Sequence, residues 1–175
     1  LSQAQLQQLS EAKASLTRMA TLNKSLLTLA RIENRQYEEI SPICFASLLC
    51  TLIEEYQDLI AFKEITLSIT EKSPFSVQMN KDLAVILLSN LLRNAIKYTY
   101  PKGKIQIEID KHVFSIANQG KPTPLDSDKI FKRFHKGEQD STSTGLGLAI
   151  VKSIVDLYQH IRLQYVYKEE KHTFL

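Results

Sequence analysis

The stretch Lys129–Leu157 reads KIFKRFHKGEQDSTSTGLGLAIVKSIVDL, and it joins an aromatic and basic turn to a polar loop, two glycines and a helix that is apolar on one face. Gly145 and Gly147 carry no Cβ and tolerate positive φ, so backbone N–H groups can come close to an anion there. The helix that follows adds unpaired N–H groups and the positive end of its dipole. This combination indicates a nucleotide-phosphate site at the start of a helix.

The residues just upstream of these glycines have the composition of a lid. They supply apolar anchors and cationic donors, which are typical of a mobile segment over phosphate: Phe131, Arg133, Phe134 and Lys136. The polar tract Gln139–Ser143 fits a lid that moves when no ligand is bound. Two glycines at a helix start can equally form a loop and cap without a ligand. A second group of residues is therefore needed to favour the nucleotide site.

That second group lies in Leu83–Thr99, LAVILLSNLLRNAIKYT. Asn94 lies four residues after Asn90, and Lys97 and Tyr98 lie three and four residues after Asn94, so the four share one helix face. Asn is a poor helix former and is costly to bury unpaired, so these amides either bond loop backbone or bind a ligand. An amide oxygen suits Mg²⁺, and Lys97 suits a phosphate. The opposite face is apolar: Leu83, Ile86, Leu87, Leu91, Leu92 and Ala95.

Four segments resemble motifs of the ATP-binding catalytic region of bacterial sensor histidine kinases, in the GHKL ATPase superfamily. NLLRNAIKYT (Asn90–Thr99) resembles the family's N box, and KIFKRF (Lys129–Phe134) resembles its F box. STGLGLAIVKSIV (Ser143–Val155) is similar to the glycine box that ends the ATP lid. IANQG (Ile116–Gly120) stands where the family carries an Asp-x-Gly box. The four segments come in the family's order, and the resemblance covers nearly the whole chain.

The resemblance implies ATP and Mg²⁺ as cofactors and a role for each matching residue. Asn94 would ligate Mg²⁺, with Asn90 and Lys97 near the phosphates. Asn118 and Gly120 would contact adenine. The other implied nucleotide-binding residues are Tyr98 beside the nucleotide and, in the lid and glycine box, Phe131, Arg133, Phe134, Lys136, Thr144, Gly145, Leu146, Gly147 and Leu148.

The chain departs from the family pattern at three places. Asn118 replaces the Asp that accepts a hydrogen bond from the amine of adenine. Its amide oxygen can accept the same bond without charge assistance, at an expected cost of about 1 kcal/mol. Lys121–Pro124 replaces a further Gly and makes a stiffer turn. Tyr158–Tyr167 lacks the Gly pair common before the last hairpin, which we expect to alter only a turn.

The family's phosphoacceptor is a His followed by an acidic residue on the first helix of a dimerisation hairpin. None of His112, His135, His160 and His172 stands in such a context, and surface or half-buried roles are expected for all four. The chain begins at Leu1 without a Met and runs straight into a helix. We therefore expect a fragment that lacks the phosphoacceptor helix, contains no catalytic residue of its own, binds ATP and cannot phosphorylate itself.

Composition excludes several other classes of protein. With 22 basic and 19 acidic side chains the formal charge is +3, and no basic patch indicates nucleic acid. Cys44 and Cys50 are too few for a disulfide framework or a metal site, so buried, reduced thiols of a cytosolic protein are expected. No apolar run reaches the roughly 18–20 residues that cross a bilayer, and we expect no signal peptide within these residues.

The segment Leu1–Tyr37 predicts one long helix with a wide apolar stripe. Apolar residues and one Asn recur every seven positions, and such a stripe needs a partner. By resemblance it is the second helix of the dimerisation hairpin; the alternative is a helix that folds back on its own domain. Glu38–Pro42 is the expected hinge, because a residue before Pro disfavours helix. The predicted domains are thus residues 1–40 and 41–175.

The rest of the chain predicts an α/β sandwich, a mixed and mainly antiparallel sheet with helices on one face, which by resemblance is the Bergerat-type ATPase fold. Apolar alternation indicates strands, and longer periodic segments indicate helices. Expected helices are Ile43–Phe62, Lys81–Thr99 and Gly145–His160, and expected strands are Ile65–Ile69, Phe75–Met79, Lys104–Asp110, His112–Ala117, Ile161–Tyr167 and Thr173–Leu175.

The resemblance implies the catalytic domain of a protein-histidine kinase in a two-component system. It would transfer the γ-phosphoryl of ATP to the missing His, for relay to an Asp of a response-regulator receiver domain. The full protein would be a homodimer and an inner-membrane sensor whose spanning segments lie outside this chain, with this part in the cytoplasm. Two alternatives remain: a catalytically weak nucleotide-sensing or docking module (a pseudokinase), suggested by Asn118, and a serine-directed relative, against which the long first helix argues.

Overall fold

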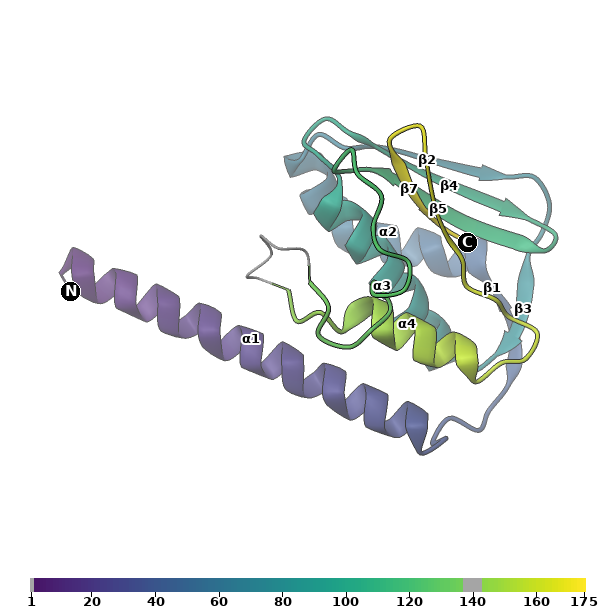
Figure 1. The fold of residues 1–175 in the computed structure, drawn as a ribbon, viewed down its shortest axis with the longest axis horizontal. Coiled ribbons are helices and arrows are strands. Elements are labelled where there is room, and N and C mark those ends of the chain that lie inside the picture. The colour runs from purple at the N-terminus through teal and green to yellow at the C-terminus, as the bar shows by residue number, and fades with distance from the viewer. Residues whose placement is uncertain (1, 137–142) are drawn as a thin grey trace.

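The computed structural model describes residues 2–136 and 143–175, in which a five-stranded sheet is covered on one face by a layer of helices (Figure 1). The layer consists of α2 (Phe45–Phe62), α3 (Lys81–Tyr98) and α4 (Gly147–Asp156). The N-terminal helix α1 (Gln3–Glu33) runs along α4 and extends beyond the layer (Figure 1). This confirms the predicted α/β sandwich with a long N-terminal helix.

The sheet is mixed and mainly antiparallel, as predicted. Its order is β2-β4-β5-β7-β6, and only the β2–β4 pair is parallel. The middle strand is therefore β5, which is hydrogen-bonded on both edges. The strands are β2 (Thr66–Glu71), β4 (Lys104–Asp110), β5 (Val113–Gln119), β6 (Tyr165–Lys168) and β7 (Lys171–Phe174).

Strands β4 and β5 bury every second side chain, as the period of a strand requires. Ile105, Ile107 and Ile109 are buried on β4. On β5 the buried residues are Phe114, Ile116 and Asn118, which pair with Ile109, Ile107 and Ile105 across the ladder. Asn118 therefore lies in line with apolar side chains on the face that the helices cover.

Helix α3 begins at an Asn cap and buries the face that the sequence predicted. The Asn80 Oδ1 accepts a hydrogen bond from the Leu83 N–H (3.1 Å), which satisfies one free donor of the first turn. Its Nδ2 donates to the Glu39 carbonyl (3.0 Å), and its N–H donates to the Tyr158 hydroxyl (3.0 Å). The cap thus ties α3 to both neighbouring segments. The buried face comprises Leu83, Leu87, Leu88, Leu91, Leu92 and Ala95, whereas Ile86, which was also predicted on this face, is only half-buried.

A second, two-stranded sheet was not predicted. Strands β1 (Ser41–Cys44) and β3 (Ser76–Met79) pair antiparallel, so α2 starts at Phe45 and not at Ile43. The Phe45 ring meets the Phe75 ring edge-on, with centroids 5.3 Å apart. Pairing with a strand more than 30 residues away, rather than local periodicity, keeps the start of the predicted helix extended.

Several other element boundaries differ from the prediction: α1 ends at Glu33 and not at Tyr37, and β2 spans Thr66–Glu71 and not Ile65–Ile69. Helix α4 begins at Gly147 because Gly145 has a φ of 69°, which helical backbone cannot adopt, and it ends at Asp156 instead of His160. Strand β5 extends to Gln119. The predicted final hairpin is present, but its first strand starts later, at Tyr165, and its second strand starts earlier, at Lys171. Its turn is Glu169–Glu170, two residues with positive φ, as a tight turn of this kind needs.

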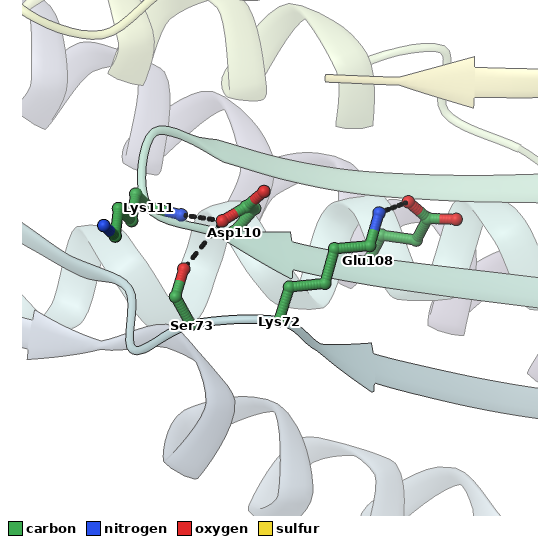
Figure 2. A network of polar contacts seen from close by, with 5 residues as sticks. All are labelled: Lys72, Ser73, Glu108, Asp110 and Lys111. Atoms are coloured by element: carbon green, nitrogen blue, oxygen red, sulfur yellow. Dashed lines mark hydrogen bonds and ion pairs between the residues drawn. The ribbon is translucent and has the colours of Figure 1, made fainter.

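One corner of the sheet, where β2 and β4 end, carries a polar network (Figure 2). The Asp110 carboxylate accepts hydrogen bonds from the Ser73 hydroxyl (2.7 Å) and the Lys111 N–H (2.7 Å). The hydrogen bond from the Ser73 hydroxyl, and to a smaller extent the one from the Lys111 N–H, holds the pKa of Asp110 below its usual value. Beside it, Lys72 pairs with Glu108 at 3.2 Å. These contacts join the segment after β2 to the β4–β5 turn.

Helix α1 is buried only at its C-terminal end. Leu29 and Ile32 belong to the core, on the side that contacts α4, so the last turns fold back on the domain. Leu9, Leu16 and Met19 are 56%, 67% and 66% exposed. The earlier turns therefore leave much of the predicted apolar stripe in solvent.

The two cysteines are unpaired but exposed, so the expectation of buried thiols was wrong. Cys44 precedes α2, where the Ser47 N–H lowers the pKa of its thiol, and Cys50 lies on the outer face of that helix. Within residues 2–136 and 143–175, no helix combines the length and the apolar character that crossing a bilayer requires.

Candidate nucleotide-binding site

The N box and the glycine box meet where α4 begins. A Cβ placed on Gly147 would lie 3.2 Å from the Oδ1 of Asn90. Asn90 is buried; its Nδ2 donates to the Ile86 carbonyl (2.8 Å) and its Oδ1 accepts from Arg93 (2.8 Å). Both ends of this amide are thus held by its own helix. Asn94 follows one turn later and is half-buried.

The glycine box also contacts the F-box turn. A Cβ on Gly145 would lie 2.7 Å from the carbonyl carbon of Phe134 and 2.9 Å from the His135 oxygen. Both neighbours are backbone atoms, and the φ of Gly145 is positive, so only Gly fits this position. Phe134 itself has a φ of 62° and a side chain that is 57% exposed. The N box, the F box and the glycine box are therefore adjacent around the start of α4, although the N box ends 30 positions before the F box begins.

Helix α4 has no side-chain cap bond at its first turn. Leu146 is buried at the N-cap position, and Leu148 is half-buried. The first N–H groups of a helix have no partner within the helix. This end of α4 therefore presents N–H donors and a positive dipole end beside Asn90, an arrangement that suits an anion.

The C-terminal end of α3 is held by a lysine that sequence reasoning missed. The Lys63 Nζ donates to three carbonyls, those of Ile96 (2.8 Å), Lys97 (2.9 Å) and Thr99 (2.9 Å). Burial lowers the pKa of Lys63. The Lys97 ammonium lies 5.3 Å from the centre of the Tyr98 ring. Lys63 thus fixes the backbone that carries two predicted site residues, and no motif in the sequence marks it.

The end of β5 touches the end of α3. Asn118 is 3% exposed, and its Nδ2 has no hydrogen-bond partner among the residues that the structure describes. Gly120 is buried next to it. A Cβ there would lie 3.0 Å from the Tyr98 carbonyl oxygen and 3.4 Å from that Nδ2. Asn118, Gly120 and Tyr98, which the resemblance assigned to one nucleotide, are therefore close together.

The segment after Gly120 is anchored by His172, for which a surface or half-buried role was expected but which is buried. Its Nε2 donates to the Lys121 carbonyl (2.8 Å), because a carbonyl can only accept. Its Nδ1 lies 2.8 Å from the Tyr165 hydroxyl, which accepts from the Leu125 N–H (2.9 Å). Burial raises the pKa of Tyr165. Period-two alternation with Phe174 could have placed His172 on the buried face.

The F-box residues face different neighbours. Phe131 packs edge-on against Phe174, with ring centroids 6.3 Å apart. Arg133 forms an ion pair with Glu33, near the end of α1. Lys136 is half-buried and is the last described residue before position 143. The predicted polar tract of the lid lies, except for Ser143, outside the described residues.

A cleft of about 440 Å³ separates the glycine box from α1. Thr144 is the one predicted site residue in its lining, and the opposite wall carries two cations and three hydroxyls. The lining residues are Ser10, Lys13, Ala14, Thr17, Arg18, Thr21 and Thr144. The glycine box thus has α3 on one side and a polar, cationic surface of α1 on the other.

The described residues contain no group of three His, Cys, Asp or Glu side chains that could hold a metal ion by itself. Mg²⁺ is usually held by one or two protein oxygens together with substrate phosphates. Asn94, one helical turn after the Asn90 that meets Gly147, would fit that mode and not a cage made by the protein alone.

Comparison with known proteins agrees with this geometry. The family described as histidine kinase-, DNA gyrase B-, and HSP90-like ATPase matches residues 79–174. The heme sensor protein HssS of Staphylococcus aureus is 31% identical over 159 residues, which are 88% of this chain and 35% of HssS. The chain therefore spans about a third of the length of the curated relatives it matches.

Solved structures show the same fold. The histidine kinase AdeS of Acinetobacter baumannii has a TM-score of 0.75 at 22% identity, covering 99% of this chain and 83% of that one. The catalytic domain of the histidine kinase ThkA has a TM-score of 0.69 at 25% identity, covering 78% and 92%. ThkA has also been solved in complex with the response regulator protein TrrA.

These relatives do not favour the serine-directed or the purely nucleotide-sensing alternative. The matched segment begins just before α3, ends in the last strand and contains all four motifs, each of which contacts α3 or another motif. The chain belongs to the histidine kinase-, DNA gyrase B-, and HSP90-like ATPase family.

Proposed function

We propose that this chain is the ATP-binding catalytic part of a sensor histidine kinase. It binds Mg²⁺–ATP and directs the γ-phosphoryl to a His on a dimerisation helix outside these 175 residues. The observation that carries the proposal is the double contact of the glycine box. Gly147 lies against Asn90 of the N box, and Gly145 lies against the F-box turn. No local pattern requires these contacts, and together they surround one anion-accepting helix end.

The proposed nucleotide lies between the end of β5 and the start of α4. Adenine contacts Asn118 and Gly120, and the Tyr98 ring packs beside the nucleotide. The phosphates lie between Lys97 and the backbone of Thr144–Gly147, with Asn90 behind them. The unpartnered Nδ2 of Asn118 supports the base site, because a buried donor without a partner is costly in a finished fold.

The proposed metal ligand is Asn94, whose amide oxygen would share Mg²⁺ with phosphate oxygens. The ion would neutralise charge that develops on the transferred phosphoryl. Phosphoryl transfer needs little covalent chemistry from the protein, so this chain's residues act by positioning and by electrostatics. Lys97 and the N–H groups at the start of α4 supply that electrostatic environment.

The phosphoacceptor is proposed to lie outside this chain because none of its four histidines suits the role. His172 is buried, and both its ring nitrogens make hydrogen bonds. His112, His135 and His160 are exposed, but they lie in turns and not on a helix. The cleft between Thr144 and α1 is where an acceptor on a neighbouring helix would approach the phosphates.

The proposed partners follow from α1 and from the relatives. Residues 1–40 are the second helix of a dimerisation hairpin, and residues 41–175 are the ATP-binding domain. The exposed apolar stripe of α1, which includes Leu9 and Leu16, would pack in a four-helix homodimer. ThkA's complex with TrrA supports a response-regulator receiver domain as the protein that accepts the phosphoryl group from the His. The chain would work in the cytoplasm, as part of a sensor anchored in the membrane by other segments.

Asn94→Ala tests the proposal. Because Asn94 supplies the only protein oxygen proposed for Mg²⁺, the variant should lose at least about tenfold in Mg²⁺-dependent ATP affinity by calorimetry. Its thermal unfolding should stay close to that of the parent, since the side chain is half-buried on a polar face. In the full-length protein the same change should abolish the acid-labile label left by γ-labelled ATP.

The matched control is Gln57→Ala, which removes an exposed amide from α2. It should change neither nucleotide affinity nor labelling. ATP affinity that is the same in Asn94→Ala and in the parent, with Mg²⁺ present, would remove Asn94 from the site. A folded parent chain that gives no heat with Mg²⁺–ATP would end the proposal as a whole.

A further inference from the structure

Asn118 carries the one buried side-chain nitrogen or oxygen that makes no hydrogen bond within the described part of the chain. It lies on the middle strand of the sheet, and its side chain is 3% exposed. An amide donor left unpaired at such a place costs more than the hydrogen bond it fails to make. An apolar side chain at this position would continue the row of Phe114 and Ile116 and would avoid that cost. The amide therefore has a use that the protein alone does not satisfy.

The backbone around Asn118 prevents the side chain from turning out to solvent. The residue pairs with Ile105 on one side and with His172 on the other, so its direction is set by two ladders. Gly120, two residues on, leaves its own side-chain position empty beside the Nδ2. The backbone of α3 at Tyr98 closes that position from the far side. The side chain is thus directed toward the end of α3, where the nucleotide site is proposed, and the torsion of its amide group stays free to turn.

An amide and a carboxylate recognise different base edges. A carboxylate only accepts hydrogen bonds, whereas an Asn side chain carries one acceptor and one donor group, and a half-turn about its last bond exchanges them. Adenine offers an amine donor at position 6 and an acceptor at N1. Guanine and hypoxanthine offer an oxygen acceptor at position 6 and a donor at N1. An amide can complement both edges, but a carboxylate faces the oxygen at position 6 with another acceptor.

We propose that Asn118 makes the base subsite accept 6-oxopurine nucleotides as well as adenine, so that the substrate class is purine nucleoside triphosphates rather than ATP alone. This inference rests on the proposed nucleotide site. With adenine, the Oδ1 of Asn118 accepts from the amine and the Nδ2 donates to N1. With a 6-oxopurine the amide is reversed, and the Nδ2 donates to the oxygen. Either base supplies the partner that the buried Nδ2 lacks.

The test compares the affinities of the Mg²⁺ complexes of ATP, ITP and GTP by calorimetry on the 175-residue chain. ITP is the decisive probe because it changes the edge at positions 1 and 6 without the extra 2-amino group of GTP. The parent chain should bind ITP within about tenfold of ATP. In Asn118→Asp the ITP-to-ATP ratio of dissociation constants should rise by about ten- to a hundredfold, since two buried acceptors would face each other. Asn23→Asp, on the exposed face of α1, should leave the ratio unchanged.

The outcomes separate the two proposals. A parent chain that binds ATP but rejects ITP by a hundredfold or more overturns the base selectivity proposed here and leaves the proposed function intact. A folded parent chain that binds none of the three nucleotides overturns the proposed function and this inference with it. If Asn118→Asp does not fold, as judged by its thermal transition, the ratio measured on the parent chain decides alone. GTP bound much more weakly than ITP would assign the difference to the 2-amino group and would not rescue a failed ITP result.

Discussion

At the residue scale, Lys63 shows how a side chain outside every motif can govern the site. Its ammonium satisfies three carbonyls at the C-terminal end of α3, where a helix leaves carbonyls unpaired. Lys63→Met keeps the aliphatic stem and removes the donor. We expect a loss of about 1–3 kcal/mol in the free energy of unfolding, measured with urea, because the hydrogen bonds are made by a charged group. Nucleotide affinity should also fall, since the backbone of Lys97 and Tyr98 loses its anchor.

Lys72→Met is the matched control. Lys72 pairs with Glu108 at the surface, and an exposed ion pair contributes little, about 0–1 kcal/mol. It should leave nucleotide affinity unchanged. Equal losses of stability in the two variants would mean that Lys63 acts as an ordinary surface cation.

The corner network of Figure 2 predicts a pH dependence. The Ser73 hydroxyl, and after it the Lys111 N–H, hold the pKa of Asp110 below its value in the unfolded chain, about 3.9. The folded state therefore favours the charged form. The contribution of the Asp110 carboxylate to the free energy of unfolding is complete at pH values above the unfolded pKa, and it is lost as the pH falls through the lower pKa of the folded state. Asp110→Asn should thus lower the urea midpoint most near pH 6, and the difference from the parent should shrink toward pH 3.

Ser73→Ala should behave in the same way, because it removes the larger cause of the shift. Glu54→Gln, at an exposed position on α2, serves as the control for a lost carboxylate. A difference between Asp110→Asn and the parent that stays constant from pH 6 to pH 3 would contradict the assignment.

At the element scale, the loop before α4 depends on Gly145. An alanine there would place its Cβ 2.7 Å and 2.9 Å from backbone atoms of the F-box turn and would keep a positive φ that costs about 1–2 kcal/mol. Gly145→Ala should lower the free energy of unfolding by at least that amount. It should also weaken ATP binding, since the F-box turn must move away from the start of α4.

Gly147→Ala is the comparison within the same loop. Among the described residues its Cβ would meet only the Asn90 side chain, with the Oδ1 at 3.2 Å, and Ala is the better helix former at the first position of α4. Its stability should stay within about 0.5–1 kcal/mol of the parent by urea unfolding. If both variants lose the same stability, the backbone contact at Gly145 is not what holds the loop.

At the scale of the whole molecule, α1 divides into a docked end and an exposed remainder. Ile32 is 1% exposed in the core, so Ile32→Ala should cost about 2–4 kcal/mol through lost burial and the cavity left behind. Urea unfolding of this variant should still be a single transition, because the residue belongs to the common core.

Leu16→Ala, at a position 67% exposed, should change the stability of the monomer by less than about 0.5 kcal/mol. The substitution should instead weaken self-association, because the apolar stripe of α1 is proposed to pack in the dimer. Sedimentation of Ile32→Ala and Leu16→Ala distinguishes a residue of the domain core from a residue of the proposed dimer contact. If Ile32→Ala left the urea midpoint unchanged, the last turns of α1 would not be part of this domain.

Local patterns in the chain were enough to predict most of the elements and the family. Strand β4 was predicted with its observed bounds because Ile105, Ile107 and Ile109 alternate without interruption. Helix α3 was predicted to within one residue because its apolar and polar faces separate at helical spacing. The family could be identified from the sequence because each of the four motifs is a short run of consecutive residues and the four come in the family's order.

Contacts across long stretches of chain could be known only from the tertiary structure. The β1–β3 pair, the three hydrogen bonds of Lys63 and the hydrogen bond from His172 to the Lys121 carbonyl all join residues 30 or more positions apart. The same holds for the approach of Gly147 to Asn90 and for the buried amide of Asn118. Periodicity reports which face of an element is apolar, but it carries no information on which atoms of another element meet that face.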